Sequence, residues 1–147
     1  MNLVDFVPQE QEVKVAIDLV QRLEVLSTKQ LTTDILESLL FSTHYITQHK
    51  DFFHKARNRH VTLIFTDKAQ LSFNLGDDYM GLNANLILYK LSSLEGKNQT
   101  EQTIILTEEM VHHFWDSADE VYVKSIVCEM IPNVILNPEL PGYIIVG

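Results

Sequence analysis

The sequence predicts a domain of the α+β class, in which helical and strand-forming segments are separated along the chain. Before residue 50, apolar residues recur at steps of three and four, which is the spacing of an amphipathic helix. Between residues 60 and 89 the pattern changes to short runs of β-branched and aromatic residues, which favour strands. After residue 103 the helical spacing returns. The chain has 147 residues, and we expect residues 1–147 to form a single domain with a substantial core.

Two helices are predicted in the first third of the chain. The first covers Gln9–Leu26, and Pro8 suits its first turn because the missing N–H would have no partner there. Its apolar stripe consists of Val13, Ile17, Val20, Leu23 and Leu26. The second helix runs from Thr33 to about Lys50, and the side chain of Thr33 or Asp34 can cap it.

A small sheet of three strands is predicted to follow. Residues 60–66, HVTLIFT, are rich in β-branched and aromatic side chains and form the first strand. Residues 70–75 alternate between apolar and polar side chains and form the second. Residues 79–89 resume extended structure, with a short apolar run at residues 86–88. We expect the three strands to form an antiparallel or mixed sheet.

Two further helices and a short strand complete the prediction. The polar segment Ser92–Gln102 is predicted to be a loop. The helix Thr103–Trp115 follows, with an apolar back made of Ile104, Met110, Val111, Phe114 and Trp115. A supporting helix covers Glu120–Ile131 and ends at Pro132. Residues 143–146, YIIV, are predicted to form a short edge strand.

The composition argues against several classes of function. The chain has 20 acidic and 11 basic residues and a net charge of −9, which repels phosphate backbones, so we expect no nucleic-acid partner. Cys128 is the only cysteine and therefore makes neither an internal disulfide nor a cysteine-based zinc site. No signal peptide is visible, and no segment approaches the ~18 apolar residues of a membrane helix. We therefore expect a cytoplasmic protein with no membrane contact.

A tight polar patch lies on the predicted helix Thr103–Trp115. Its members are Glu108, Glu109 and His112, and a helix places Glu108 and His112 one turn apart over the same surface. Two such side chains can hold one metal ion, while Glu109 acts as a base toward a water on that ion. Alternatively, these acids only interact with the helix dipole. The other histidines are spaced irregularly and are expected at the surface or at helix ends: His44, His49, His54 and His60.

The order of these features resembles the zincin metallopeptidases, most closely their compact gluzincin-type forms, including small HExxH domains of bacterial and phage regulatory proteins. The matching features are the strand pattern MGLNANLILYKLSSL, a polar loop, the acidic helix with its histidine and the acidic start of the next helix. The resemblance covers roughly residues 60–132. It implies that Glu109 is the general base, that His112 is the second metal ligand and that Glu120 is the third. Glu129 is a weaker candidate for the third ligand.

The motif departs from HExxH at one position, because Glu108 stands in the place of the first histidine. Carboxylate oxygen also binds zinc, so a Glu108–His112–Glu120 ligand set is chemically feasible. Two carboxylates would make the ion a weaker Lewis acid and would favour harder metals such as manganese or iron. The resemblance thus implies zinc or another divalent metal as the cofactor, or none if the altered site is degenerate.

Three functions fit these observations. The first is a metal-dependent, peptidase-like hydrolase with an altered ligand set. The second is a degenerate, metal-free zincin-like module that binds or regulates a partner, and the missing histidine is the argument for it. The third is a carboxylate-bridged di-iron protein, which needs a second ExxH and a four-helix bundle. It ranks last because the chain has no second ExxH and because strands are predicted between its helices.

The resemblance also implies where a partner would bind. In the family an edge strand runs along the cleft, and here that strand would be Leu82–Tyr89. It would hold an extended peptide or protein segment by main-chain hydrogen bonds. The same exposed edge could pair with a second copy of the chain to form a homodimer.

Overall fold

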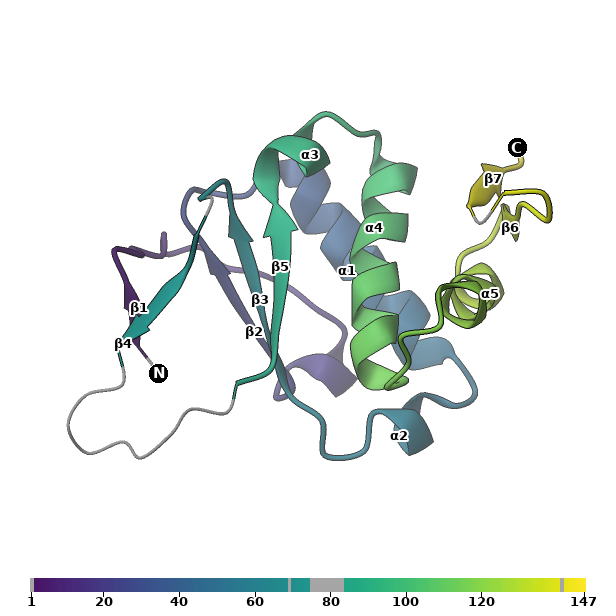
Figure 1. The fold of residues 1–147 in the computed structure, drawn as a ribbon, viewed down its shortest axis with the longest axis horizontal. Helices are drawn as coiled ribbons and strands as arrows, with labels where there is room; N and C mark the ends of the chain where they lie inside the picture. The colour runs from purple at the N-terminus through teal and green to yellow at the C-terminus, as the bar shows by residue number, and fades with distance from the viewer. Residues whose placement is uncertain (1, 69, 75–83, 141) are drawn as a thin grey trace.

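A computed structural model of the chain describes residues 2–68, 70–74, 84–140 and 142–147. Its central element is a sheet of three parallel strands in the order β2 (Leu23–Ser27), β3 (Val61–Thr66) and β5 (Leu86–Lys90). Two long helices, α1 (Thr33–Gln48) and α4 (Gln99–Phe114), lie side by side against one face of this sheet (Figure 1). The α+β class predicted from the sequence is confirmed.

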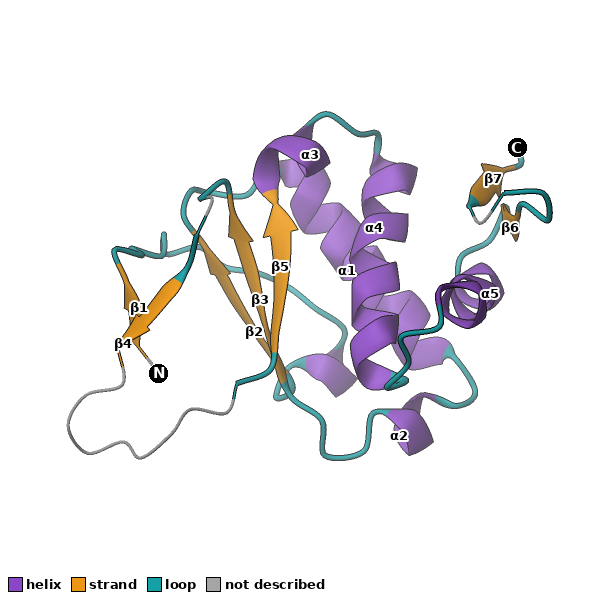
Figure 2. Ribbon diagram, in the orientation of Figure 1, coloured by secondary structure: helices purple, strands orange, loops and turns teal. Residues whose placement is uncertain are grey.

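Smaller elements flank this arrangement. β1 (Asn2–Val4) pairs antiparallel with β4 (Ser72–Asn74) on the far side of the sheet from the helices (Figure 2). At the opposite end, β6 (Val134–Leu136) pairs antiparallel with β7 (Tyr143–Ile145), and α5 (Glu120–Met130) lies between this hairpin and α4. Short helical segments are η1 (Ile17–Leu19), α2 (Phe52–Lys55) and α3 (Leu91–Glu95).

The core lies between the parallel sheet and the helices. The apolar back predicted for the helix Thr103–Trp115 is confirmed, because Ile104, Met110, Val111, Phe114 and Trp115 are all buried. Burying one such large side chain contributes about 1.5–3 kcal/mol, and this fixes the rotation of α4 about its axis. Within the described ranges, no helix combines the length and the apolarity needed to cross a membrane.

The helix predicted at Gln9–Leu26 is wrong, so a pair of long helices does not open the chain. Residues 17–19 form only a single 3-10 turn, and residues 23–27 form β2. Leu23 and Val25 also satisfy the two-residue period of a strand, and both pack against the core where β2 pairs with β3. The apolar residues of this segment fit both a helix spacing and a strand spacing, and the pairing with β3 selects the strand. The second predicted helix is confirmed by α1.

The sheet also differs from the predicted antiparallel or mixed arrangement. β3 and β5 confirm two of the predicted strands, but they run parallel to each other and to β2. Residues 72–74 of the remaining predicted strand form β4, which belongs to a separate sheet with β1. Parallel neighbours need a crossover connection, and α1 supplies it between β2 and β3. Predicted strand residues 75 and 79–83, including the start of Leu82–Tyr89, lie outside the described residues.

The loop predicted at Ser92–Gln102 is largely helical. α3 covers Leu91–Glu95, and α4 begins at Gln99 rather than at residue 103. Asn98 caps α4, since its Oδ1 accepts from the Glu101 N–H at 2.9 Å and its Nδ2 donates to the Glu101 carboxylate at 2.6 Å. The polar composition of this segment therefore reflects helix capping. The predicted supporting helix and the C-terminal edge strand are confirmed by α5 and β7.

Candidate metal centre

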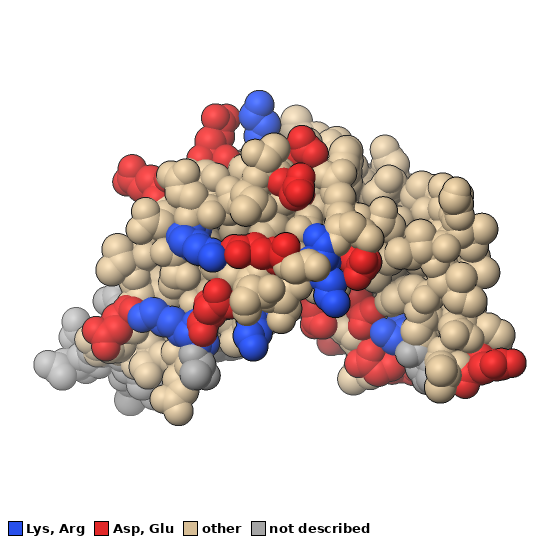
Figure 3. Space-filling model, turned by 90° about the horizontal axis from the view of Figure 1, so that it is seen from above, with Lys and Arg blue, Asp and Glu red and all other residues tan. Residues whose placement is uncertain are grey.

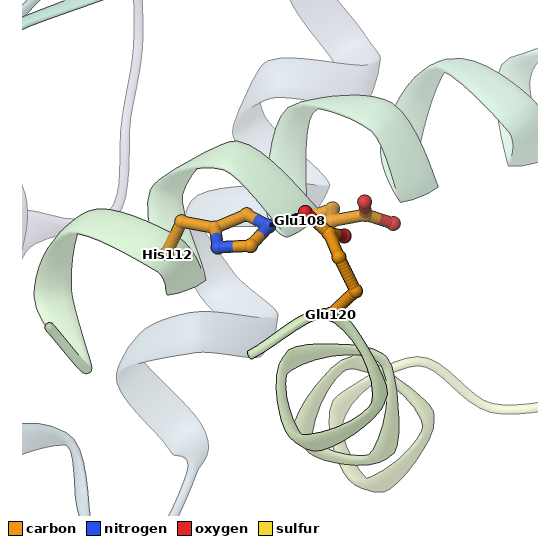
Figure 4. Close-up of side chains that lie close together, drawn as sticks. All are labelled: Glu108, His112 and Glu120. Carbon is orange, nitrogen blue, oxygen red and sulfur yellow. Dashed lines mark ion pairs between the residues drawn. The ribbon is translucent and has the colours of Figure 1, made fainter. Parts of the chain in front are cut away.

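Glu108, His112 and Glu120, the three predicted metal ligands, meet at the junction of α4 and α5. Glu108 and His112 lie one turn apart on α4, and Glu120 is the first residue of α5. One ligand atom from each side chain lies within 4.8 Å of the other two. Figure 4 shows the three side chains directed toward one another from the two helices. The structure thus brings together all three residues, and their role as metal ligands stays a prediction.

A tight turn carries the chain from α4 back to Glu120. Asp116 adopts a left-handed backbone conformation with φ of 51°, which aspartate tolerates better than most residues. Arg59 fixes this turn, because its guanidinium lies 3.1 Å from the Asp116 carboxylate and donates to the His113 carbonyl at 3.2 Å. The Asp119 side chain then caps α5 by accepting a first-turn N–H at 3.1 Å.

The imidazole of His112 is oriented by the same turn. Its Nδ1 lies 2.7 Å from the carbonyl oxygen of Ser117, and because a carbonyl only accepts hydrogen bonds, Nδ1 carries a proton. In the neutral ring Nε2 then keeps its lone pair, and this atom lies 3.4 Å from Glu120 Oε1. Two acceptors that face each other are stable only with a proton or a cation between them. A hydrogen bond from Nδ1 to a carbonyl is the usual support of a metal-binding histidine.

Glu108 has two partners that sequence reasoning did not assign to it. The Lys124 ammonium lies 3.0 Å from each of its carboxylate oxygens, and the Tyr143 hydroxyl donates to Oε2 at 2.5 Å. The side chains of Glu108 and Lys124 are only 17% and 13% exposed, so water screens this ion pair weakly. Burial, and after it the Glu108 carboxylate, raise the pKa of Tyr143, which keeps its hydroxyl a donor. Lys124 Nζ also lies 3.9 Å from Glu120.

The predicted base, Glu109, lies near the three ligand candidates without joining them. Its side chain is exposed, yet its surroundings remove part of its hydration, and this loss raises the pKa of its carboxyl. His112 acts in the opposite direction, while the Glu108 and Glu120 carboxylates raise the pKa further and Lys124 lowers it. A carboxylate with a raised pKa is a stronger proton acceptor than an ordinary one.

The weaker candidate for the third ligand, Glu129, belongs to a different cluster. Its Oε2 lies 2.7 Å from Nε2 of His49, and the His49 ring packs edge-on against Trp115 with centroids 5.3 Å apart. His49 does lie at the end of α1, as expected for this histidine. Its side chain is only 5% exposed, however, so it is part of the interior rather than the surface.

The molecular surface is hollowed between the two ends of the molecule. In Figure 3 the outline is concave between the part with the parallel sheet and the part with the C-terminal hairpin, and acidic side chains gather beside the hollow. β5 is the edge strand nearest α4, and the Tyr89 hydroxyl donates to the Leu106 carbonyl of that helix at 2.8 Å. A cavity of about 310 Å³ is lined by Glu101, Ile104, Ile105, Tyr143 and Ile145.

The donor set fits a divalent metal ion in its chemistry. An imidazole nitrogen and two carboxylate oxygens suit zinc, manganese or iron. Bonds of about 2.0–2.2 Å to one ion need ligand atoms somewhat closer together than in this arrangement. Glu120 can close the difference, because its side chain is 60% exposed and free to change rotamer. The Lys124 ammonium lies 3.0 Å from both oxygens of Glu108, on the side where an ion held by both of them would lie.

No protein-family model, curated protein or solved structure matches this chain. A functional assignment therefore depends on the arrangement of the chain's own side chains.

Proposed function

We propose that this protein is a metal-dependent hydrolase of the zincin-like kind that cleaves peptide bonds. Glu108, His112 and Glu120 would hold the metal ion, and Glu109 would be the general base. The observation that carries the proposal is the convergence of three ligand atoms within 4.8 Å, together with a His112 ring that a hydrogen bond from Nδ1 fixes and whose Nε2 lies 3.4 Å from Glu120. Neither an accidental acidic surface nor a helix-dipole effect requires that orientation of the ring.

A bound divalent ion would supply Lewis acidity, which lowers the pKa of water and polarises a carbonyl. Glu109 is suited to take the proton from the attacking water, because its raised pKa makes it a stronger base than an ordinary surface glutamate. The same carboxyl group can then pass that proton to the leaving amine. Its exposed position leaves room for a substrate beside it.

An extended peptide is the substrate that suits the surroundings of the cluster. Among the described strands, β5 pairs on one side only, with β3, so its other edge offers main-chain groups to a peptide. The cavity beside Tyr143 is lined largely by isoleucine side chains and would take an apolar side chain of that peptide.

A second function is favoured by one specific contact. Lys124 binds both oxygens of Glu108, so a positive charge already balances this carboxylate in the chain itself. A degenerate, metal-free zincin-like module would need such a positive charge to offset the repulsion between the carboxylates that once held the metal. Such a module would bind a partner along β5 without cleaving it.

Metal binding and peptide cleavage separate the two functions. Purified protein should retain zinc, manganese or iron after dialysis, measured by mass spectrometry of the metal content, and should cleave members of a fluorogenic peptide library. Glu109→Gln should bind the metal as wild type does and lose at least about 100-fold in cleavage rate, the lower range for a general base. Glu12→Gln, an exposed glutamate outside the cluster, is the matched control and should change neither.

Two results would count against the hydrolase. The first is a protein that binds none of the three metals at millimolar concentration, which leaves the metal-free module. The second is cleavage that Glu109→Gln leaves intact, which removes Glu109 from the reaction.

A further inference from the structure

We infer that Lys124 competes with the metal ion: its ammonium takes the cation position at Glu108 in the metal-free protein, and an arriving divalent ion must displace it. This inference rests on the metal site of the proposed function. It adds a residue that sets how tightly that site binds a metal. When no metal is bound, the same residue balances the negative charge of Glu108.

The position of the ammonium is that of a bound cation. Lys124 Nζ lies 3.0 Å from both Glu108 oxygens and 3.9 Å from Glu120 Oε2, so it is shared by two of the three ligand candidates. An ion that Glu108 held with both oxygens would lie on the same side of the carboxylate. An ion held there by both oxygens would need the space that the ammonium occupies, so a chelated ion and the ammonium compete for Glu108.

Electrostatics explains why the lysine is needed. The carboxylates of Glu108 and Glu120 lie close together and both repel that of Glu109, and the shielded one, Glu108, would be costly to leave without a counter-charge. Lys124 is largely buried beside it, and its ammonium also lies 4.9 Å from the centre of the Tyr143 ring, a cation–π distance. A divalent ion brings a larger charge to the same carboxylates and makes the ammonium unnecessary.

The cost of this competition can be estimated from populations. A ligand that binds only when a site is free loses apparent affinity in proportion to the free fraction. If Lys124 occupies Glu108 nine times in ten, the apparent dissociation constant rises about tenfold. Removal of the ammonium should therefore strengthen metal binding, which is the opposite of what loss of a merely structural residue does.

Calorimetric titration with manganese chloride and with zinc chloride, each alone, tests this inference. Lys124→Met keeps the length and apolar stem of the side chain and should bind the metal about tenfold more tightly than wild type. Lys124→Arg keeps the charge and should stay within about threefold of wild type. Lys97→Met, an exposed lysine outside the cluster, is the matched control and should not change the affinity. Circular dichroism confirms that each variant is folded.

A measurement on the wild-type protein covers the case in which Lys124→Met does not fold. In a metal titration followed by NMR of the lysine ammonium groups, the Lys124 signal should change from slow to fast exchange with water as the ion replaces it. An ammonium that stays slowly exchanging on the metal-loaded protein would overturn the inference.

The outcomes also separate this inference from the proposed function. If wild type binds metal and Lys124→Met binds it equally or more weakly, the competition is refuted and the hydrolase stands. If only Lys124→Met binds metal, the competition is supported and the natural protein is the metal-free module. If neither protein binds metal, both proposals fail.

Discussion

Two histidine–glutamate pairs in this molecule use the same residue types and join α5 to a neighbouring helix, yet they are built in opposite ways. In the pair of His49 with Glu129, Nδ1 accepts the Asp51 N–H at 3.1 Å, so Nε2 carries the proton and donates to the carboxylate at 2.7 Å. In the pair of His112 with Glu120, Nδ1 donates to a carbonyl, and Nε2 faces the carboxylate at 3.4 Å.

In each pair, the group that contacts Nδ1 determines whether Nε2 carries a proton and hence what it can bind. The His49 pair is complete, because every polar contact of the ring has a donor and an acceptor. The His112 pair is completed only when a proton or a cation lies between Nε2 and the Glu120 carboxylate. The His49–Glu129 pair therefore has a structural role, and the His112–Glu120 pair is a candidate for metal binding.

The largest difference in metal affinity is expected between two single variants, in which either His112 or His49 is replaced by alanine. We expect His112→Ala to weaken metal binding at least about 100-fold, beyond the loss caused by removing an outer-shell partner. His49→Ala should leave metal affinity unchanged and should lower the free energy of unfolding by about 1–3 kcal/mol, because it removes a buried hydrogen-bonded ring. Calorimetry and urea denaturation of both variants test the contrast, which fails if both variants lose the same property.

A smaller effect is expected from Glu108→His, which adds a second imidazole beside His112 and Glu120. The change completes the HExxH pattern and also takes away the partner of Lys124. Zinc affinity should therefore rise at least about tenfold, with a smaller gain for manganese, because imidazole suits zinc better than it suits harder ions. Competitive titration against a zinc chelator measures the change, and unaltered affinity would show that residue 108 is not a ligand.

The smallest effect concerns Glu109 and pH. Partial loss of hydration raises the pKa of this carboxyl above its ordinary value of 4.5, so the folded protein holds a proton there more tightly than the unfolded chain. Ionised Glu109 therefore costs stability, and that cost is absent well below pH 4.5 and grows as the pH rises above it. Glu109→Gln should be slightly more stable than wild type at pH 7, by less than about 1 kcal/mol because an exposed charge is screened. Urea denaturation at pH 7 and pH 4 should show the gain only at pH 7.

The sequence pattern predicted the helices and strands whose apolar residues follow a single spacing. α1 and α5 carry apolar stripes of a single period, and β3 is a short β-branched run, so sequence and structure agree there. β2 was missed because its apolar residues fit a helix and a strand equally, and only the distant partner β3 decides between them. α3 was missed because a segment with many polar residues still buries Leu91 and Leu94.

The candidate site shows the same division. The one-turn spacing of Glu108 and His112 is a local property of a helix, and it could be read directly from the sequence. The Tyr143 contact joins residues 35 positions apart across the C-terminal hairpin, and no local pattern carries it. Lys124 left one local sign, its position four residues after Glu120, but the stronger contact with Glu108 depends on how α5 crosses α4. The orientation of the His112 ring depends on a backbone carbonyl in the turn.

The turn around Asp116 has a consequence for how an ion would meet this molecule. His112 and Glu120 are joined by one short stretch of chain, and Arg59 anchors that stretch from outside it. Closing so short a tether costs little entropy, and that cost is met when the chain folds rather than when an ion arrives. If the proposed metal site is correct, folding would already bring His112 and Glu120 near each other, and an ion would need only a rotamer change of Glu120.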